Sequence, residues 1–474
     1  AKSGRQDRPL IMCEYSHAMG NSNGNLKEYW DAIHSTPGLQ GGFIWEFWDH
    51  GIEQTLPDGT KRSAYGGDFG ETRHDGNFVC DGMVFPDRTP KPAMSEMKAI
   101  ASPVVISTAK ASAGSFTITN RQYFKDLSDF EGFWSINRNG EIIDSGKIAL
   151  PNIAPQKSAK VSIKSKSLLK PDAAGERFIN FTIVQKNRTD WAPAGHEVAW
   201  NQFALPSRKE TIAPAKTNEL YEGAVDGSGE IQIPFGVIAP ELSLWRAPTD
   251  NDRIAHISTK WEHYGVRELE RTDCTITETS KSYKVVSEWK TSTGFKIKQT
   301  QVVTPVKDGY SVKETIVVPK QLEDLARVGI NFEIDGALSN YTYFGTGSNE
   351  TYPDRKIGRV HKWVSKVADQ YVPYVRPQEN GGHAGVRWFE LTDSSGRGVR
   401  IDLDTPRQVS ATPFRATQLA DATHDVELVP TGNTIVHIDA AHRGVGTASC
   451  GPDTLPQYLV SGGTYSFSWT VRAI

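Results

Sequence analysis

Cysteine is scarce in this chain and widely spaced. The 474 residues contain four cysteines, and no two of them form a C-x-x-C pair. They are Cys13, Cys80, Cys274 and Cys450. Such spacing argues against a disulfide framework and against a structural zinc site, and it favours a reducing compartment. We therefore expect a cytoplasmic protein.

The chain also lacks an excess of one charge and a long apolar run. Lys and Arg total 53 and Asp and Glu total 56, so electrostatics give no reason to expect a nucleic acid or an anionic membrane as partner. No apolar run approaches the length of a membrane span. With 38% hydrophobic and 23% charged residues, the composition is typical of a soluble globular protein of two to four domains.

Tryptophan, by contrast, is abundant, with twelve residues. Some of these side chains belong in a core. Aromatic planes are also the surfaces on which pyranose rings stack in sugar-binding sites, so the composition leaves a carbohydrate ligand open.

The first fifty residues predict a strand, a helix and a second strand. Residues 9–14 are a short apolar run, typical of a parallel strand covered on both faces. Residues 24–38 carry apolar side chains on one helical face and end in Pro-Gly. Residues 41–50 supply a second apolar strand, which completes a βαβ unit. Because two strands cannot form a stable sheet alone, we expect residues 1–100 to be the end of a larger α/β domain.

Short strands dominate the rest of the chain. Residues 103–208 predict an antiparallel β-sandwich, with one hairpin that turns at Asn139-Gly140. The proline-containing stretch 205–216 is the predicted linker. From there strands continue to the end, where residues 464–474 alternate aromatic and polar side chains.

Glu14 is the first candidate functional residue. It lies at the end of the first predicted strand, which is where barrel enzymes place catalytic groups. His17 follows three residues later and could hydrogen-bond a substrate hydroxyl. Position alone leaves open that Glu14 is an ordinary exposed or salt-bridged glutamate.

Three motifs resemble a known family. CEYSHAMGNSNG (13–24), LQGGFIWEFWDHGI (39–52) and YGGDFGETRHDGNFVCDGMVFPDRTPKPA (65–93) are similar to successive motifs near the end of the catalytic barrel in glycoside hydrolase family 2 β-galactosidases. Later matches are RAPTDND (246–252), TYFGTGSNETYPDR (342–355), YVPYVRPQENGGH (371–383) and HRGVGTASCGPD (442–453). The resemblance covers essentially the whole chain.

The resemblance implies a multidomain architecture. Residues 1–102 would be the C-terminal part of a (β/α)8 TIM barrel, and residues 103–208 an immunoglobulin-like β-sandwich. Residues 209–474 would form a large antiparallel β-sandwich, the C-terminal domain of β-galactosidases.

The resemblance also implies an activity and its residues. The reaction is hydrolysis of terminal non-reducing β-D-galactose residues in β-galactosides such as lactose, by a retaining double displacement. Glu14 matches the catalytic nucleophile, His17 a histidine that holds galactose hydroxyls, and Trp45 the floor beneath the sugar. Phe78 matches a residue whose backbone carbonyl faces a sodium ion. Asp81 falls where many members have an asparagine that binds sodium and a substrate hydroxyl.

Other parts of the family's site are expected outside these residues. The acid/base glutamate and most Mg²⁺ ligands belong to an N-terminal portion of the enzyme that we expect to be missing here. A homo-oligomer is implied as well. The loop at 444–453 has Cys450 or Gly451 where some members carry a tryptophan beneath the leaving group, so binding of the second sugar could differ.

We interpret the remaining polar residues of these motifs as structural. Glu46 and Asp49 are expected to support the site or the fold, and Asp68 to cap backbone N–H groups in a turn. The same interpretation applies to the predicted ion-pair set Arg246, Asp250 and Asp252 and to the histidines His383 and His442.

Alternative functions remain at this point. A different family 2 specificity, such as β-glucuronidase or β-mannosidase, would share the same chemistry. A non-catalytic carbohydrate-binding or assembly subunit would keep the fold without turnover. A purely structural β-sandwich protein is disfavoured by the first hundred residues.

Overall fold

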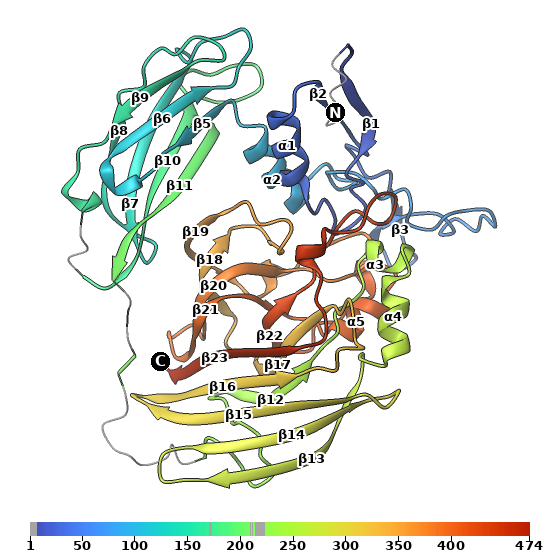
Figure 1. The fold of residues 1–474 in the computed structure, drawn as a ribbon. Coiled ribbons are helices and arrows are strands. Elements are labelled where there is room, and N and C mark those ends of the chain that lie inside the picture. The colour runs from blue at the N-terminus through green and yellow to red at the C-terminus, as the bar shows by residue number, and fades with distance from the viewer. Residues whose placement is uncertain (1–6, 170–172, 209, 211, 214–222) are drawn as a thin grey trace. The chain divides into compact units, whose positions relative to one another are not determined.

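The structure, a computed structural model, describes residues 7–169, 173–208, 210, 212–213 and 223–474 (Figure 1). The chain divides into two compact units. Unit 1 comprises Ala1–Glu96, Ala213–Gly358 and Trp363–Ile474, and unit 2 comprises Met97–Ile212 and Arg359–Lys362. Among the helices described, none is long and apolar enough to cross a membrane.

Unit 1 opens with the predicted βαβ arrangement. Its elements are β1 (Leu10–Tyr15), α1 (Leu26–Ser35) and β2 (Leu39–Ile44), followed by the hairpin of β3 (Ile52–Thr55) and β4 (Lys61–Ala64). β1 and β2 pair in parallel, which confirms the prediction of parallel strands. The helix α2 (Pro92–Ile100) carries the boundary between the units.

Two details of this unit differ from the sequence-based expectation. β1 is not covered on both faces, because Leu10 and Ile11 are 51% and 50% exposed. β2 ends at Ile44, so Trp45 lies directly after the strand rather than in it. The chain leaves the ladder there because the Glu46 N–H donates to the carbonyl of Asp81 instead of to a strand neighbour.

Unit 2 consists of two antiparallel sheets that share one core. One sheet has the order β11-β10-β7-β8 and the other β5-β6-β9. The strands are β5 (Val104–Ser107), β6 (Ser115–Asn120), β7 (Phe130–Arg138), β8 (Glu141–Ile148), β9 (Ser158–Ser162), β10 (Gly175–Gln185) and β11 (Glu197–Arg208). Phe116 from the small sheet packs edge-on against Phe181 from the large one, and both are buried.

The predicted hairpin is present, and the predicted linker is partly wrong. β7 and β8 are joined by Asn139 and Gly140, both with positive φ, as a two-residue hairpin turn requires. Residues 205–208 belong to β11, where Leu205 is buried against the core. Residues 209, 211 and 214–216 of the predicted linker lie outside the described residues.

The remainder of unit 1 contains three short α-helices and most of a twelve-stranded antiparallel sheet, of which residues Arg359–Lys362 are assigned to unit 2. Its main path is β12-β17-β22-β21-β23-β16-β15-β14-β13, with β18 paired to β19 and β20, and β20 also to β21. The strands are β12 (Gly236–Ser243), β13 (Leu269–Glu278), β14 (Tyr283–Thr291), β15 (Lys296–Val306), β16 (Gly309–Val317), β17 (Arg327–Asp335), β18 (Asn340–Gly347), β19 (Arg359–Lys366), β20 (Gly382–Thr392), β21 (Gly398–Thr412), β22 (Asn433–His442) and β23 (Thr464–Ala473). The helices are α3 (Asp250–Ile254), α4 (Ile257–Tyr264) and α5 (Ala416–Asp421).

This sheet encloses a single large core. Side chains from distant strands, such as Trp289 of β14 and Phe332 of β17, belong to the same buried cluster. The alternation predicted for the last strand is confirmed, since Phe467, Trp469 and Val471 of β23 are buried. A loop between two of its strands contacts the site described next.

Candidate functional site

The site begins at the carboxyl ends of the two parallel strands. Glu14 is exposed and lies one residue before the end of β1. Its neighbour Tyr15 faces α1, because it accepts a hydrogen bond from the Trp30 indole. Between Met12 and Tyr15 the register of β1 against β2 shifts, so regular strand alternation does not apply at Glu14. Trp45 follows β2, and its N–H donates to the Tyr15 carbonyl.

His17, Trp45 and Asp81 form a connected polar cluster. The Trp45 indole Nε1 donates to Asp81 Oδ2 at 3.1 Å, and His17 Nε2 lies 3.3 Å from the same oxygen. The Phe78 ring lies 5.3 Å from the His17 ring. Asp81 is 3% exposed, yet its other oxygen, Oδ1, has no hydrogen-bond partner. A buried carboxylate oxygen without a donor can accept a hydroxyl or a cation.

The charge of Asp81 is maintained by its neighbours. Burial acts to raise the pKa of Asp81, but hydrogen bonds from His17, Glu46 and Trp45 overcome it, and the net pKa is lowered. The pKa of Glu46 is raised, first by burial and then by the adjacent Asp81. The two carboxyl groups therefore differ in role, since Asp81 keeps its negative charge while Glu46 retains a proton more readily.

The structure brings four of the five predicted residues together. His17, Trp45, Phe78 and Asp81 are in contact. Glu14 reaches none of them through a hydrogen bond, ion pair or ring contact in the part of the chain that the structure describes. Along the chain it lies three residues before His17, and the backbone N–H of Trp45 donates to the carbonyl of its neighbour Tyr15.

Two residues that sequence reasoning missed hold His17 in place. Ser449 Oγ lies 2.8 Å from His17 Nδ1, and the Ser449 N–H donates to Asn251 Oδ1 at 2.9 Å. Ser449 precedes Cys450, which is exposed. The loop noted for lacking a tryptophan therefore approaches His17 through its serine. In the sequence, Asn251 and Ser449 are indicated only by the resemblance of RAPTDND and of the final loop to the family. That resemblance assigns no role to either residue.

The loop after Glu14 is anchored to the large sheet at several points. The Asn21 N–H donates to Gln378 Oε1 at 3.0 Å, and its side-chain amide donates to the Glu379 carbonyl at 2.7 Å. Gly24 donates to the Gly446 carbonyl at 3.1 Å. The backbone that carries His17 is therefore fixed by segments more than 350 residues away in the chain.

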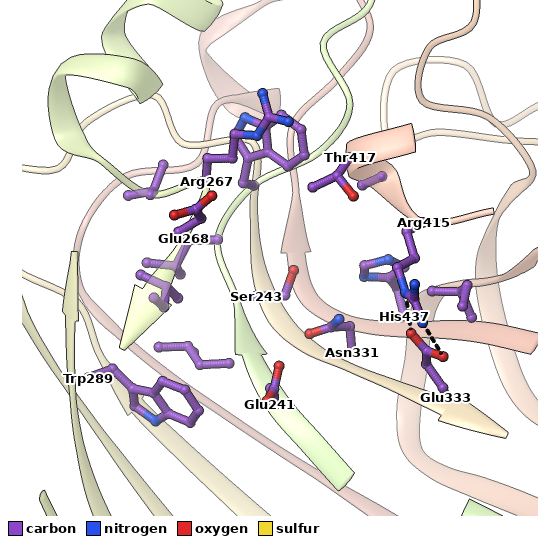
Figure 2. Close-up of a pocket in the computed structure, with 17 residues that line it drawn as sticks. Glu241, Ser243, Arg267, Glu268, Trp289, Asn331, Glu333, Arg415, Thr417 and His437 are labelled. Carbon is purple, nitrogen blue, oxygen red and sulfur yellow. Dashed lines mark hydrogen bonds and ion pairs between the residues drawn. The ribbon is translucent and has the colours of Figure 1, made fainter. Parts of the chain in front are cut away.

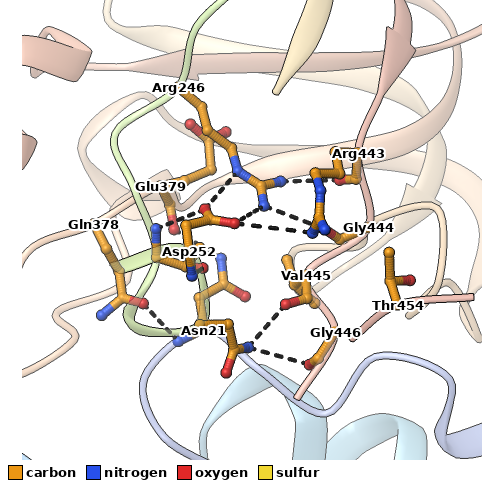
Figure 3. A network of polar contacts seen from close by, with 12 residues as sticks. Asn21, Arg246, Asp252, Gln378, Glu379, Arg443, Gly444, Val445, Gly446 and Thr454 are labelled. Atoms are coloured by element: carbon orange, nitrogen blue, oxygen red, sulfur yellow. Dashed lines mark hydrogen bonds and ion pairs between the residues drawn. The ribbon is translucent and has the colours of Figure 1, made fainter. Parts of the chain in front are cut away.

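A buried ion-pair network supports these anchors (Figure 3). Arg246 donates two hydrogen bonds to Asp252, at 3.0 and 2.9 Å, and Arg443 lies 3.9 Å from the same carboxylate. All three side chains are fully buried. The prediction of an internal ion pair is thus confirmed for Arg246 and Asp252. Asp250 is paired with Arg253 instead, at 3.7 Å, and also accepts from Asn77 and Gln378.

The residues interpreted as structural behave accordingly. Asp49 is buried and paired with Lys91 at 2.8 Å. Asp68 accepts the Tyr65 N–H, which confirms the predicted cap, and also contacts His424. His383 and His442 are buried, and burial lowers the pKa of each.

Metal-binding capacity is limited to isolated oxygens. Among the residues that the structure describes, no group of three or more His, Cys, Asp or Glu side chains could hold a metal ion. Asp81 Oδ1 is a buried carboxylate oxygen without a hydrogen-bond partner.

These features define a multidomain, mostly β protein with a polar site at the end of a βαβ unit. The family described as "Beta galactosidase small chain" matches residues 225–471. "Glycosyl hydrolases family 2, TIM barrel domain" matches residues 1–106, and "Beta-galactosidase, domain 4" matches residues 116–206. The chain therefore belongs to the glycoside hydrolase family 2 β-galactosidases.

Two similar proteins have "Beta-galactosidase" in their names. A protein from Arthrobacter sp. (strain B7) named "Beta-galactosidase" is 30% identical over 97% of this chain and 50% of its own length. "Beta-galactosidase BgaC" from Bifidobacterium adolescentis is 31% identical over 93% of this chain and 45% of its own length. The chain thus spans about half the length of these relatives.

Comparison with solved structures adds little. An alpha-mannosidase from Enterococcus faecalis V583 aligns over 79% of this chain and 42% of its own, at 11% identity and a TM-score of 0.31. A galactose mutarotase-like protein from Lactobacillus casei aligns over 43% and 73%, at 10% identity and a TM-score of 0.24. Scores this low support no argument about fold or function.

Proposed function

We propose that this chain is part of a retaining β-galactosidase, which releases terminal non-reducing β-D-galactose from β-galactosides such as lactose. One observation carries the proposal. Glu14 lies at the carboxyl end of a parallel strand, beside loops that bring His17, Trp45 and Asp81 into contact. This arrangement offers a nucleophile, hydroxyl-binding groups and an aromatic surface within one site.

Each residue has a role in the proposed reaction. The Glu14 carboxylate attacks the anomeric carbon and forms a glycosyl-enzyme, which water then hydrolyses. His17 and ionised Asp81 hold sugar hydroxyls, and Trp45, which is 45% exposed, presents a ring to the sugar. A retaining mechanism needs a second carboxyl group about 5–5.5 Å from the nucleophile. In our proposal that acid/base glutamate comes from outside these 474 residues.

The proposal also includes a bound cation and a homo-oligomeric assembly. The free Asp81 Oδ1 and the Phe78 carbonyl would hold Na⁺, whose charge would fix Asp81 and polarise a bound hydroxyl. In the proposal, Mg²⁺ would be held by residues outside these 474. Leu10, Ile11 and Phe43 on β1 and β2 are 50–68% exposed, and exposed apolar groups of this size are normally covered. We propose that the rest of the barrel covers them, in a homo-oligomeric enzyme.

The decisive test is substitution of the nucleophile in the complete enzyme. Glu14→Gln removes the attacking oxygen charge and should lower kcat by at least about a thousandfold, measured with an aryl β-galactoside. The matched control is Glu53→Gln, an exposed glutamate on β3 paired with Lys61, which should keep full activity.

Covalent labelling identifies the residue directly. A 2-deoxy-2-fluoro-galactoside should modify Glu14, detected by peptide mass spectrometry. Modification of Glu46, or turnover that persists in Glu14→Gln, would refute the assignment. Sugar binding without turnover in the complete protein would favour the non-catalytic alternative. Preference for β-glucuronides or β-mannosides would indicate another family 2 specificity.

A further inference from the structure

A second polar cavity lies in the large sheet of unit 1, on residues that take no part in the site around Glu14. Its volume is about 290 Å³, and all of its lining residues lie between Glu241 and His437 in the sequence (Figure 2). Trp245 and Trp289 contribute apolar walls. A cavity of this size is near the lower end of the range for small-molecule sites.

The sheet places three polar side chains in one row across this cavity. Glu241 of β12 lies opposite Asn331 of β17, and Asn331 lies opposite His437 of β22. Residues directly opposite one another project from the same face of a sheet. The alternate residues of β17, such as Ile330 and Phe332, fill the apolar core instead. The polar row is therefore a feature of one face rather than a scattered set of substitutions.

Members of this row lack protein partners. His437 is 8% exposed, and its Nδ1 has no hydrogen-bond partner. Burial lowers the pKa of His437 well below its usual value, so the ring is neutral. The Asn331 amide makes no hydrogen bond within the part of the chain that is described. The unpartnered Nδ1 of buried His437 costs free energy, and a ligand hydroxyl would remove that cost. Asn331 is half-buried and Glu241 is exposed, so both can be reached by a ligand.

The charges of the lining select against ions. Arg415 is already bonded to Glu333, with Nη2 at 2.9 Å from Oε2, and Arg267 is bonded to Asp421. Each guanidinium therefore already has a carboxylate partner, and Glu241 and Glu268 add negative charge to the lining, which disfavours an anion. Among the described residues, no group of three or more His, Cys, Asp or Glu side chains could hold a metal ion, so the cavity offers no site for a divalent cation.

We propose that this cavity binds a neutral polyhydroxylated ligand, a pyranose sugar, through Glu241, Asn331 and His437, at a site distinct from the one around Glu14. The amide both donates and accepts, the carboxylate accepts, and the neutral imidazole does one or the other. This alternation matches the hydroxyl groups of a pyranose. The proposal does not depend on the catalytic role of Glu14.

Fluorine NMR of the full chain labelled with 5-fluorotryptophan tests the site locally. The signals of Trp245 and Trp289 are assigned with the variants Trp245→Phe and Trp289→Phe. Titration with methyl β-D-galactopyranoside or methyl β-D-glucopyranoside should shift these two signals. Asn331→Ala and the isosteric Glu241→Gln should each raise Kd by about tenfold, the effect of losing one good hydrogen bond.

Controls separate this cavity from other effects. Asn187→Ala changes an exposed asparagine in unit 2 and should leave Kd unchanged, as should Glu14→Gln. Far-ultraviolet circular dichroism verifies that each variant is folded. The proposal is wrong if neither glycoside shifts the two signals, if both cavity variants bind as the wild type does, or if inorganic phosphate shifts the signals and the glycosides do not.

Discussion

At the scale of single residues, the molecule contains charged and neutral groups whose state is fixed by burial. Asp81 is held ionised by the donors around it, whereas His383 is held neutral. The His383 ring lies between the Tyr343 hydroxyl at 3.1 Å and Gln370 Oε1 at 2.7 Å. Asp81 is therefore tested through ion binding, and His383 through stability.

Asp81→Asn should weaken the sodium dependence of activity in the complete enzyme. The substitution keeps the shape of the side chain and removes the charge that we propose faces the cation. The sodium concentration for half-maximal activity should rise by roughly tenfold, since a charged ligand contributes on the order of 1.4 kcal/mol. Asp87→Asn, in a nearby exposed turn, is the control. An unchanged sodium response in Asp81→Asn would exclude this residue from the ion site.

His383 should make the protein less stable in mild acid. Burial lowers the pKa of His383 to about 3 from a usual value of 6.5. Between those values the unfolded chain binds a proton that the folded chain does not, so the free energy of unfolding falls as the pH falls. The slope is up to about 1.4 kcal/mol per pH unit for this residue. Urea unfolding between pH 7 and pH 4 measures it.

The variant His383→Gln should show a shallower dependence on pH than the wild type, whatever its stability at pH 7. His263→Gln changes an exposed histidine of α4 and should reproduce the wild-type slope, because water surrounds that side chain in both states. Equal slopes for wild type and His383→Gln would contradict the prediction.

The sequence alone identified some residues of the site and missed others. The three motifs at 13–24, 39–52 and 65–93 were sufficient to select His17, Trp45, Phe78 and Asp81, because family resemblance carries residues one by one. Ser449 could not be selected, because its contact with His17 joins positions 432 residues apart. No periodicity or local spacing encodes such a contact.

At the scale of elements, local sequence patterns predicted where strands and helices form. They did not predict which segments pack around them. α1, the hairpin at Asn139-Gly140 and the alternation in β23 follow from side-chain periodicity and turn chemistry. The exposure of β1 was not predicted. An apolar run indicates that a strand is buried, but it does not show which other segments bury the strand. The early end of β2 was missed because Glu46 bonds to a loop 35 residues later.

The loop between β1 and α1 depends on a glycine. Gly20 has a φ of +59°, and an added Cβ would lie 2.3 Å from Asp250 Oδ2 and 2.5 Å from Gln378 Nε2. These side-chain ends cannot move freely, because they bond to each other and Gln378 also accepts from Asn21. Gly20→Ala should therefore reduce the free energy of unfolding by at least about 2 kcal/mol.

Gly59→Ala is the matched comparison for that loop. Gly59 also has a positive φ, +89°, but nothing lies within 4 Å of an added Cβ. Its substitution carries the backbone cost alone, about 1 kcal/mol. Thermal or urea unfolding compares the two variants. Equal losses would show that the contacts of Gly20 do not matter.

At the scale of the whole molecule, a buried ion-pair network joins segments of unit 1 that are far apart in sequence. Arg246 and Arg443 converge on Asp252, and Arg246 also donates to the Arg443 carbonyl. These charges are out of water, so their stabilisation depends on every partner being present. The family match covers this region, yet only the structure shows which residues pair.

Asp252→Ala should destabilise unit 1 by about 3–5 kcal/mol, because two buried guanidinium groups lose their shared carboxylate. Asp421→Ala removes the partner of Arg267 in a pair whose side chains are 42% and 65% exposed, and it should change stability by less than about 1 kcal/mol. Chemical unfolding measures both. A loss below 1 kcal/mol for Asp252→Ala would show that the network contributes little.

The contact between His17 and Ser449 has a consequence for biosynthesis. A ribosome makes Ser449 432 residues after His17. Unit 2, drawn almost wholly from one continuous stretch, can fold as it emerges. The contact of His17 must wait, so a nascent chain that stalls or is cut before Ser449 would carry His17 without the serine that orients its imidazole.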